Sequence, residues 1–132
     1  MLRVVLDTNI VVSALMSPNG NPAIILDMLA DQKLRICYSH EILTEYLDVL
    51  SRTHFKFSLK DRNDFIQGVK QFGLYVHPSV NDIQLTDGDD QCFYDVAKQC
   101  EAVLITGNTK HYPTWPFIVT PAEFFALIGH QK

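Results

Sequence analysis

Asp7 stands at the point where a short apolar segment ends. It follows the apolar run 2–6 and precedes Thr8 and Asn9. In open α/β sheets the ligand crevice lies outside the carboxyl ends of the strands, so a carboxylate at such a junction points toward a binding site. An aspartate in this position can also cap the helix that follows, and the pattern favours the two interpretations about equally.

The same arrangement recurs nearer the carboxyl end of the chain. The apolar run 103–105 is followed by Thr106, Gly107 and Asn108. We therefore expect a second buried strand that delivers polar oxygens to its carboxyl end.

A third group of polar residues opens a helical segment. Asp87, Asp89 and Asp90 precede apolar residues that recur at helical spacing. Acidic residues compensate the helix dipole at such a position, and each contributes about 0.3–1 kcal/mol. Only one side chain can occupy the cap itself, so a cluster of acids exceeds that need. The cluster therefore indicates a cation or a positively charged partner.

Length and composition predict a globular protein. The chain has 132 residues, of which 47% are hydrophobic and 20% charged, so we expect a single domain over residues 1–132. Its net charge of −4 and its pI near 5.6 lack the basic character typical of nucleic-acid-binding modules, although an acidic metal site would add negative charge of its own. Cys37, Cys92 and Cys100 form no CxxC pair, as expected for reduced thiols. The sequence shows no leader and no membrane-spanning run, which predicts a cytoplasmic location.

The rest of the chain alternates between apolar runs and helical periodicity. Strands are predicted at 2–6, 34–38, 74–77, 103–106 and 117–119. Helices are predicted up to residue 15, at about 22–30, from a Ser39 cap to about 52, at 60–72 after a Ser58 cap, from 87–90 onward, and at 121–128. Strands separated by helices imply right-handed crossovers and a three-layer α/β/α fold, with a central parallel sheet of four or five strands covered on both faces.

One of these helices carries a narrow polar stripe. Glu41, Glu45, Asp48 and Arg52 lie on a helix whose other positions are largely apolar. The pattern favours a solvated face, and nothing in the periodicity distinguishes Glu45 from its neighbours.

Four segments resemble the motifs of the PIN-domain family, in the branch described as toxin components of toxin–antitoxin systems. They are VLDTN at 5–9, SHEILTEY at 39–46, DGDDQCF at 87–93 and VLITGN at 103–108. Their order and spacing make the resemblance specific, and it covers nearly the whole chain. It implies a PIN-like fold, a Mg²⁺ or Mn²⁺ cofactor and hydrolysis of phosphodiester bonds in single-stranded RNA. The acidic site that it implies consists of Asp7, Glu45 and Asp90.

The residue types suit that chemistry. Mg²⁺ takes oxygen ligands and is often held by one or two carboxylates together with substrate phosphate. We expect Asp7 and Asp90 to be the metal ligands, directly or through water. Glu45 is expected to orient or deprotonate the attacking water.

Other polar residues are expected to support this site. Asn9 and Thr106 are predicted to fix the Asp7 carboxylate or to contact phosphate. Lys110 and His111 follow directly after the second strand end and are the favoured phosphate-binding residues.

Two further segments leave alternatives open. The aromatic loop 112–116 either lines the site or only joins two strands. The connector 52–62 carries several basic residues with Phe55 and Phe57 between them, a composition that can grip RNA. For this segment an ordinary charged connector is the favoured interpretation.

Position 108 departs from the family pattern, which usually has a fourth aspartate there. Asn108 keeps a carbonyl oxygen that can accept a hydrogen bond or ligate a metal, so it stays among the expected catalytic residues, but one negative charge is lost. Metal affinity should therefore fall. Asp87, Asp89 and Asp95 are nearby acids that would compensate, and Asp87 is favoured because Asp95 lies on a different helix face from Asp90.

The sequence supports three functional hypotheses. The first is a metal-dependent endoribonuclease that forms a homodimer and is neutralised by a small antitoxin, all of which the resemblance implies. The second is a catalytically weakened PIN-like module that binds RNA or a protein partner, because Asn108 weakens the metal site. The third, a phosphoryl-transfer or phosphatase enzyme on a doubly wound sheet, ranks last because Asn9 stands where such an enzyme would have a second aspartate.

Overall fold

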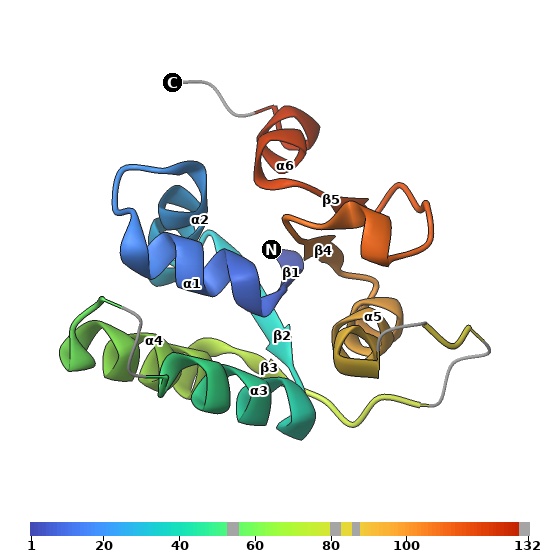
Figure 1. Ribbon diagram of the computed structural model, residues 1–132. Helices are drawn as coiled ribbons and strands as arrows, with labels where there is room; N and C mark the ends of the chain where they lie inside the picture. The colour runs from blue at the N-terminus through green and yellow to red at the C-terminus, as the bar shows by residue number, and fades with distance from the viewer. Residues whose placement is uncertain (53–55, 80–82, 86–87, 130–132) are drawn as a thin grey trace.

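Five parallel strands form the centre of the structure. The computed structural model describes residues 1–52, 56–79, 83–85 and 88–129, and for Asp89 the backbone alone. The strands are β1 (Leu2–Leu6), β2 (Leu34–Tyr38), β3 (Leu74–Tyr75), β4 (Val103–Ile105) and β5 (Ile118–Val119). Their order in the sheet is β3-β2-β1-β4-β5, so the first strand of the chain is the central one (Figure 1).

Helices cover both sides of this sheet. One side carries α1 (Thr8–Met16), α2 (Asn21–Ala30) and α6 (Pro121–Leu127), and the other carries α3 (His40–Leu50), α4 (Leu59–Phe72) and α5 (Gly88–Cys100) (Figure 1). A short 3₁₀ helix, η1 (Thr109–His111), follows β4. The predicted three-layer α/β/α fold with a parallel sheet is confirmed, and the sheet has five strands.

The predicted helices and strands are present, but three predicted strands are too long. The strand predicted at 74–77 ends at Tyr75, because its partner β2 ends at the paired position. The strand predicted at 103–106 ends one residue earlier, because the Thr106 hydroxyl accepts a hydrogen bond from the Asn108 N–H (3.0 Å) and the chain turns there. The strand predicted at 117–119 begins one residue later. The 3₁₀ helix η1 was not predicted.

Polar side chains cap three of the helices. Ser39 accepts a hydrogen bond from the Ile42 N–H at the start of α3, as the sequence predicts. Ser58 caps α4 in the same way, which is also as predicted. At the start of α6, Thr120 and Glu123 form a reciprocal capping box, so one Glu123 oxygen is engaged with the backbone.

A buried tyrosine ties three helices to the end of the central strand. Tyr46 of α3 is fully buried, and its hydroxyl donates a hydrogen bond to the carbonyl oxygen of Leu6. Its ring packs against Phe65 of α4 and Phe93 of α5, with centroid distances of 5.5 and 6.2 Å. Leu6 directly precedes Asp7, so this packing fixes the strand end from which the acid projects.

The three cysteines are free thiols, as predicted. Burial, followed by the neighbouring Cys100, raises the pKa of the Cys37 thiol to about 12, so this thiol stays protonated at neutral pH. In the described ranges, no helix combines the length and the apolar character needed to cross a membrane.

Gly68 lies within α4, and Gly73 caps its carboxyl end. Alanine at each position gives a matched pair of predictions for the free energy of unfolding. A Cβ at position 73 would lie 2.4 Å from the Val69 carbonyl oxygen and 2.9 Å from the Tyr38 ring, whereas one at position 68 would have nothing within 4 Å. We expect Gly73→Ala to lower the free energy of unfolding by about 1–3 kcal/mol or more. Gly68→Ala should raise it by about 0.5–1 kcal/mol, because alanine loses less backbone entropy in a helix. Urea denaturation measures both, and equal effects would contradict the packing at Gly73.

Candidate active site

The Asp7 side chain is buried and held by two hydroxyl groups. Its Oδ2 atom accepts hydrogen bonds from Thr106 Oγ1 at 2.7 Å and from the Tyr112 hydroxyl at 3.1 Å, and the residue is 7% exposed. Asp7 occupies the cap position of α1, but its side chain makes no capping hydrogen bond with any described residue. Of the two interpretations left open by the sequence, the structure therefore disfavours the cap. The carboxylate faces the end of β4 instead.

The turn after β4 organises this contact. Thr106 is fully buried, and its hydroxyl both donates to Asp7 and accepts from the Asn108 N–H. The Gly107 N–H lies 3.4 Å from the Asn9 side-chain oxygen, at the hydrogen-bonding limit. Asn9 thus lies against the turn that carries Thr106, and it links the start of α1 to the end of β4.

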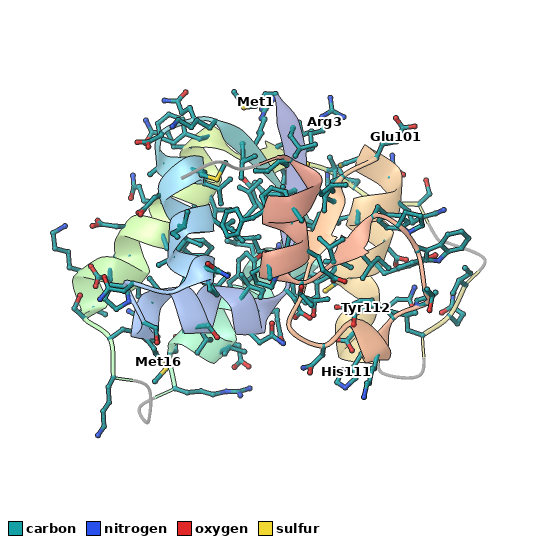
Figure 2. The ribbon with its side chains drawn as sticks, turned by 90° about the horizontal axis from the view of Figure 1, so that it is seen from above. Met1, Arg3, Met16, Glu101, His111 and Tyr112 are labelled. Atoms are coloured by element: carbon teal, nitrogen blue, oxygen red, sulfur yellow. The ribbon has the colours of Figure 1, made fainter. Side chains whose placement is uncertain are left out.

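Asp90 comes from α5 and pairs with a histidine of η1. Asp90 is 9% exposed, and its Oδ2 atom lies 3.3 Å from His111 Nδ1. The His111 side chain is about half exposed, and Lys110 beside it is exposed. Figure 2 shows His111 at the end of the molecule opposite Met1, which is the end where β1 and β4 stop. His111 was predicted as a phosphate-binding residue, and the structure adds its contact with Asp90.

The Tyr112 hydroxyl donates to Asp7 and lies near the charge of Asp90, a role that sequence reasoning did not assign to it. Burial raises the pKa of its hydroxyl, and the negative charges of Asp7 and Asp90 raise it further, so the hydroxyl stays a hydrogen-bond donor. The loop 112–116 was left open between lining the site and joining strands, and its first residue lines the site. The sequence shows only an aromatic residue shortly after a polar strand end. Many connecting loops have this feature, so it did not single out Tyr112.

Glu45 and Asp7 both lie near Cys92, which places Glu45 close to the acid site. Burial raises the pKa of the Cys92 thiol to about 12, and the nearby charges of Glu45, Glu41 and Asp7 add to this effect. Glu45 is half-buried, whereas Glu41 and Asp48 are exposed. The predicted solvated face of α3 therefore fits Glu41 and Asp48 better than it fits Glu45. The neutral thiol is a poor nucleophile at neutral pH, which argues against cysteine chemistry here.

The oxygen atoms of this site suit a hard divalent cation. Asp7 and Asp90 are buried carboxylates, and the charge of each raises the pKa of the Tyr112 hydroxyl. Among the described residues, no three His, Cys, Asp or Glu side chains come together as a metal cluster. Mg²⁺ does not require such a cluster, since it keeps several waters and binds through one or two carboxylates plus substrate phosphate. The donor set therefore fits Mg²⁺ or Mn²⁺ better than a metal that needs an all-protein cage.

The acids expected to compensate for Asn108 are only partly described. Asp87 and the side chain of Asp89 lie outside the described residues. Asp95 accepts a hydrogen bond from Gln91 Nε2 at 2.8 Å, within α5.

The basic connector behaves largely as an ordinary charged segment. Arg52 pairs with Asp48 at 3.4 Å and Lys60 with Asp64 at 2.7 Å, in exposed ion pairs within their own helices. Residues 53–55, which include His54 and Phe55, lie outside the described residues. The pairs that can be seen agree with the favoured interpretation of a charged connector.

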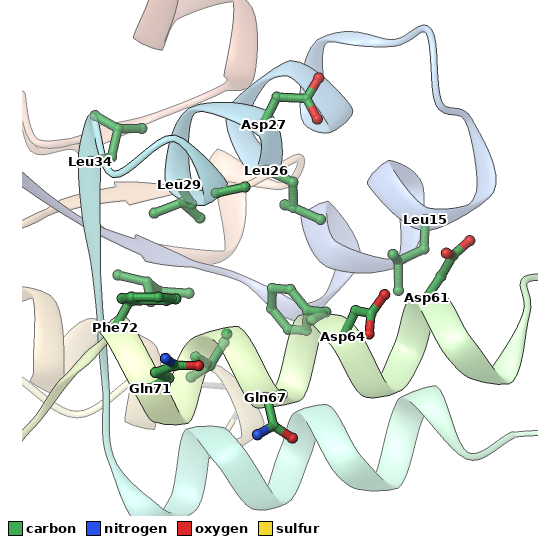
Figure 3. A pocket seen from close by; sticks show the side chains of 15 residues that line it. Leu15, Leu26, Asp27, Leu29, Leu34, Asp61, Asp64, Gln67, Gln71 and Phe72 are labelled. Atoms are coloured by element: carbon green, nitrogen blue, oxygen red, sulfur yellow. The ribbon is translucent and has the colours of Figure 1, made fainter.

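An apolar pocket of about 490 Å³ lies between α2 and α4, and none of the acid-site residues lines it (Figure 3). Leu26 and Leu29 of α2 face Phe72 of α4 across it. Asp61 and Asp64 also line the pocket, so it has an acidic border. The molecule thus has an acid site at the carboxyl edge of the sheet and a separate apolar pocket.

Replacing Thr106 by valine tests how the Asp7 carboxylate is held. Valine keeps the side-chain shape but removes the hydroxyl that donates to Asp7, so we expect the free energy of unfolding to fall by about 1.5–3 kcal/mol. Urea denaturation at neutral pH measures this change. The matched control is Thr114→Val at an exposed position, where a change within about 0.5 kcal/mol is expected. A loss at Thr106 no larger than the control would mean that Tyr112 alone satisfies the carboxylate.

Comparisons with known proteins identify the family of this chain. The family model of the PIN domain matches residues 3–110. An uncharacterized protein of Methanocaldococcus jannaschii, MJ1680, is 32% identical over 110 residues, which are 81% of this chain and 71% of that protein. The crystal structure of VapBC2 from Rickettsia felis bound to a DNA fragment from their promoter contains a chain of similar fold, with a TM-score of 0.57 at 17% identity over 90% of this chain and 97% of that chain. The chain belongs to the PIN-domain family.

Proposed function

We propose that this protein is a Mg²⁺- or Mn²⁺-dependent endoribonuclease that hydrolyses single-stranded RNA, as the toxin of a toxin–antitoxin pair. One observation carries the proposal: the buried Asp7 carboxylate does not cap its helix but accepts a hydrogen bond from Tyr112, whose neighbour His111 contacts Asp90. Membership of the PIN-domain family and the fold shared with a VapBC2 chain support it.

In this proposal Asp7 and Asp90 bind the metal, and Glu45 activates the attacking water. Asp7 and Asp90 hold the cation, and Thr106 and Tyr112 orient the Asp7 carboxylate through their hydroxyls. When bound, the cation neutralises charge on the phosphate and lowers the pKa of water. Glu45 orients the attacking water and accepts its proton. The water oxygen forms a bond to phosphorus, the bond from phosphorus to the leaving ribose oxygen breaks, and that oxygen takes up a proton from solvent. No covalent link to the protein forms.

Substrate contacts come from the segment that follows β4. Lys110 is exposed on η1 and is proposed to bind a backbone phosphate next to the cleaved bond. Asn9 and Asn108 offer side-chain amides at the same strand ends, where their NH₂ groups donate hydrogen bonds to phosphate.

The test is cleavage of a labelled single-stranded RNA by the purified protein. We expect cleavage with Mn²⁺ or Mg²⁺ and none after chelation with EDTA, while an equal concentration of double-stranded RNA stays intact. Cleavage that persists in EDTA would overturn the metal dependence, and an absence of cleavage with both metals would overturn the nuclease.

A weakened module that binds RNA or a protein partner is the second candidate, and Asn108 favours it. The side chain at this strand end is neutral where the family usually has a carboxylate. Under this alternative the wild-type protein binds single-stranded RNA but does not cleave it with either metal. The two candidates are thus separated by measuring binding and cleavage on the same RNA.

The proposed partners are an antitoxin and a second copy of the chain. The apolar pocket between α2 and α4, with Asp61 and Asp64 at its border, is proposed to take an antitoxin segment that carries apolar and basic side chains. The homodimer and the cytoplasmic location stay predictions. Light scattering on the purified protein measures its mass in solution and tests the homodimer.

A further inference from the structure

A second, more polar pocket lies beside the acid site. It measures about 380 Å³, within the usual range of about 300–1,000 Å³ for small-molecule sites. The segment from η1 to β5 supplies most of its lining, and Glu123 of α6 completes it. The pocket therefore belongs to the part of the chain that follows the β4 turn.

Tyr112 joins this pocket to the acid site. Its side chain lines the pocket, and its hydroxyl donates the hydrogen bond to Asp7. Lys110 lines the pocket as well, one residue from His111, which contacts Asp90. The pocket and the acid site thus share Tyr112.

Trp115 gives the pocket an aromatic wall. Trp115 lines the pocket and is 39% exposed, so it has surface available to a ligand. Its ring stacks on Phe117 with a centroid distance of 6.3 Å, and Lys98 Nζ lies 5.1 Å from the ring centroid. Pro113 and Pro116 restrict the backbone on either side. An indole held in this way loses little freedom when a planar group stacks on it.

The polar residues of the pocket favour a phosphate at one position and a base at another. Lys110 attracts phosphate, whereas Glu123 repels it and can accept hydrogen bonds from the N–H groups of a base. One Glu123 oxygen is used by the Thr120 N–H, so the other is available for this role. Thr109 and Thr114 add hydroxyls that can donate or accept.

We propose that this pocket is a nucleobase-binding subsite, in which one base of the RNA stacks on Trp115 while Lys110 holds the adjoining phosphate. The inference rests on the proposed RNA substrate and adds a place where a base next to the cleaved bond is held. Base stacking on an aromatic side chain contributes to single-strand binding with little sequence preference. The Glu123 carboxylate adds a preference for bases that present N–H donors.

The protein provides its own probe, because Trp115 is its only tryptophan. The experiment titrates the wild-type protein in EDTA with a short single-stranded RNA and, separately, with an abasic ribose-phosphate chain of the same length. We expect the RNA to quench the tryptophan fluorescence and the abasic chain to leave it unchanged. Equal quenching by both would overturn the proposal, and so would RNA binding without any change in fluorescence.

Variants at Trp115 give the second readout. Trp115→Leu should weaken binding of a labelled RNA by roughly 5- to 100-fold, the range expected when one base loses its aromatic partner. Trp115→Phe keeps an aromatic face and should recover most of the affinity, while thermal melts establish that both variants are folded. Unchanged affinity in a folded Trp115→Leu protein would overturn the subsite.

The outcomes also separate this subsite from the proposed nuclease. Cleavage of RNA without a fluorescence response would overturn the subsite and leave the nuclease standing. Fluorescence quenching by RNA, without cleavage when Mn²⁺ is added, would support the subsite and overturn the nuclease.

Discussion

Asp7→Asn should abolish RNA cleavage and leave the protein folded. Asparagine has nearly the same shape and keeps an oxygen for the Thr106 and Tyr112 hydroxyls, but it removes the charge that is proposed to bind the cation. Loss of a partner that only orients a metal ligand costs about 10–100-fold in affinity or activity, so loss of the ligand charge itself should cost more than about 100-fold. Initial rates on labelled RNA with Mn²⁺ measure the effect, and circular dichroism measures folding.

Asp90→Asn should give a loss of the same order, because Asp90 is the second proposed ligand. The matched control is Asp48→Asn on the exposed face of α3, whose ion pair with Arg52 is worth little to stability. We expect the control to cleave at the wild-type rate. If Asp7→Asn or Asp90→Asn retained full activity in a folded protein, the proposed metal site would be wrong.

Asn108→Asp should strengthen metal binding by roughly 10-fold or more, because metal affinity rises with the charge of the ligands. The substitution leaves the backbone contact from position 108 to Thr106 intact, since that contact uses the N–H group. Titration with Mn²⁺ followed by electron paramagnetic resonance measures the affinity directly. Cleavage should increase in parallel at Mn²⁺ concentrations below saturation.

Asn19→Asp provides the control for the added charge. Asn19 lies exposed in the loop between α1 and α2, so its substitution changes the net charge equally without adding a carboxylate at the strand ends. We expect Mn²⁺ affinity to stay within about twofold of wild type. If Asn108→Asp behaved like this control, the side chain at position 108 would lie outside the metal site.

The fold could be predicted from the sequence because its elements are locally determined. The runs 2–6 and 34–38 are mostly apolar and each is followed by a polar residue, and both are strands with the predicted limits. The limits of β3 and β4 could not be predicted, because they depend on where a partner strand stops and on the Thr106 hydroxyl. Such contacts are set by the sheet and not by the residues of the strand itself.

The part of the candidate site built from strand ends could be predicted from the sequence. The part built from η1 and the loop after it could not. Two strands that stop at one edge of a parallel sheet bring their polar ends together, which is how Asp7 and Thr106 come into contact. A capping aspartate and a ligand aspartate share one sequence pattern, so only the observed hydrogen bonds could distinguish them. Tyr112 and the contact of His111 with Asp90 depend on the path of η1, which no periodicity encodes.

The placement of β1 at the centre of the sheet has a consequence for the protein during its synthesis. The partners of Asp7 are separated from it by 99 positions, at Thr106, and by 105 positions, at Tyr112. A nascent chain that has emerged only as far as α4 holds the aspartate but neither hydroxyl donor, and β1 has no β4 beside it. Under the proposed function, unfinished chains are harmless to the RNA around the ribosome, and the acid site assembles only after translation has passed Tyr112.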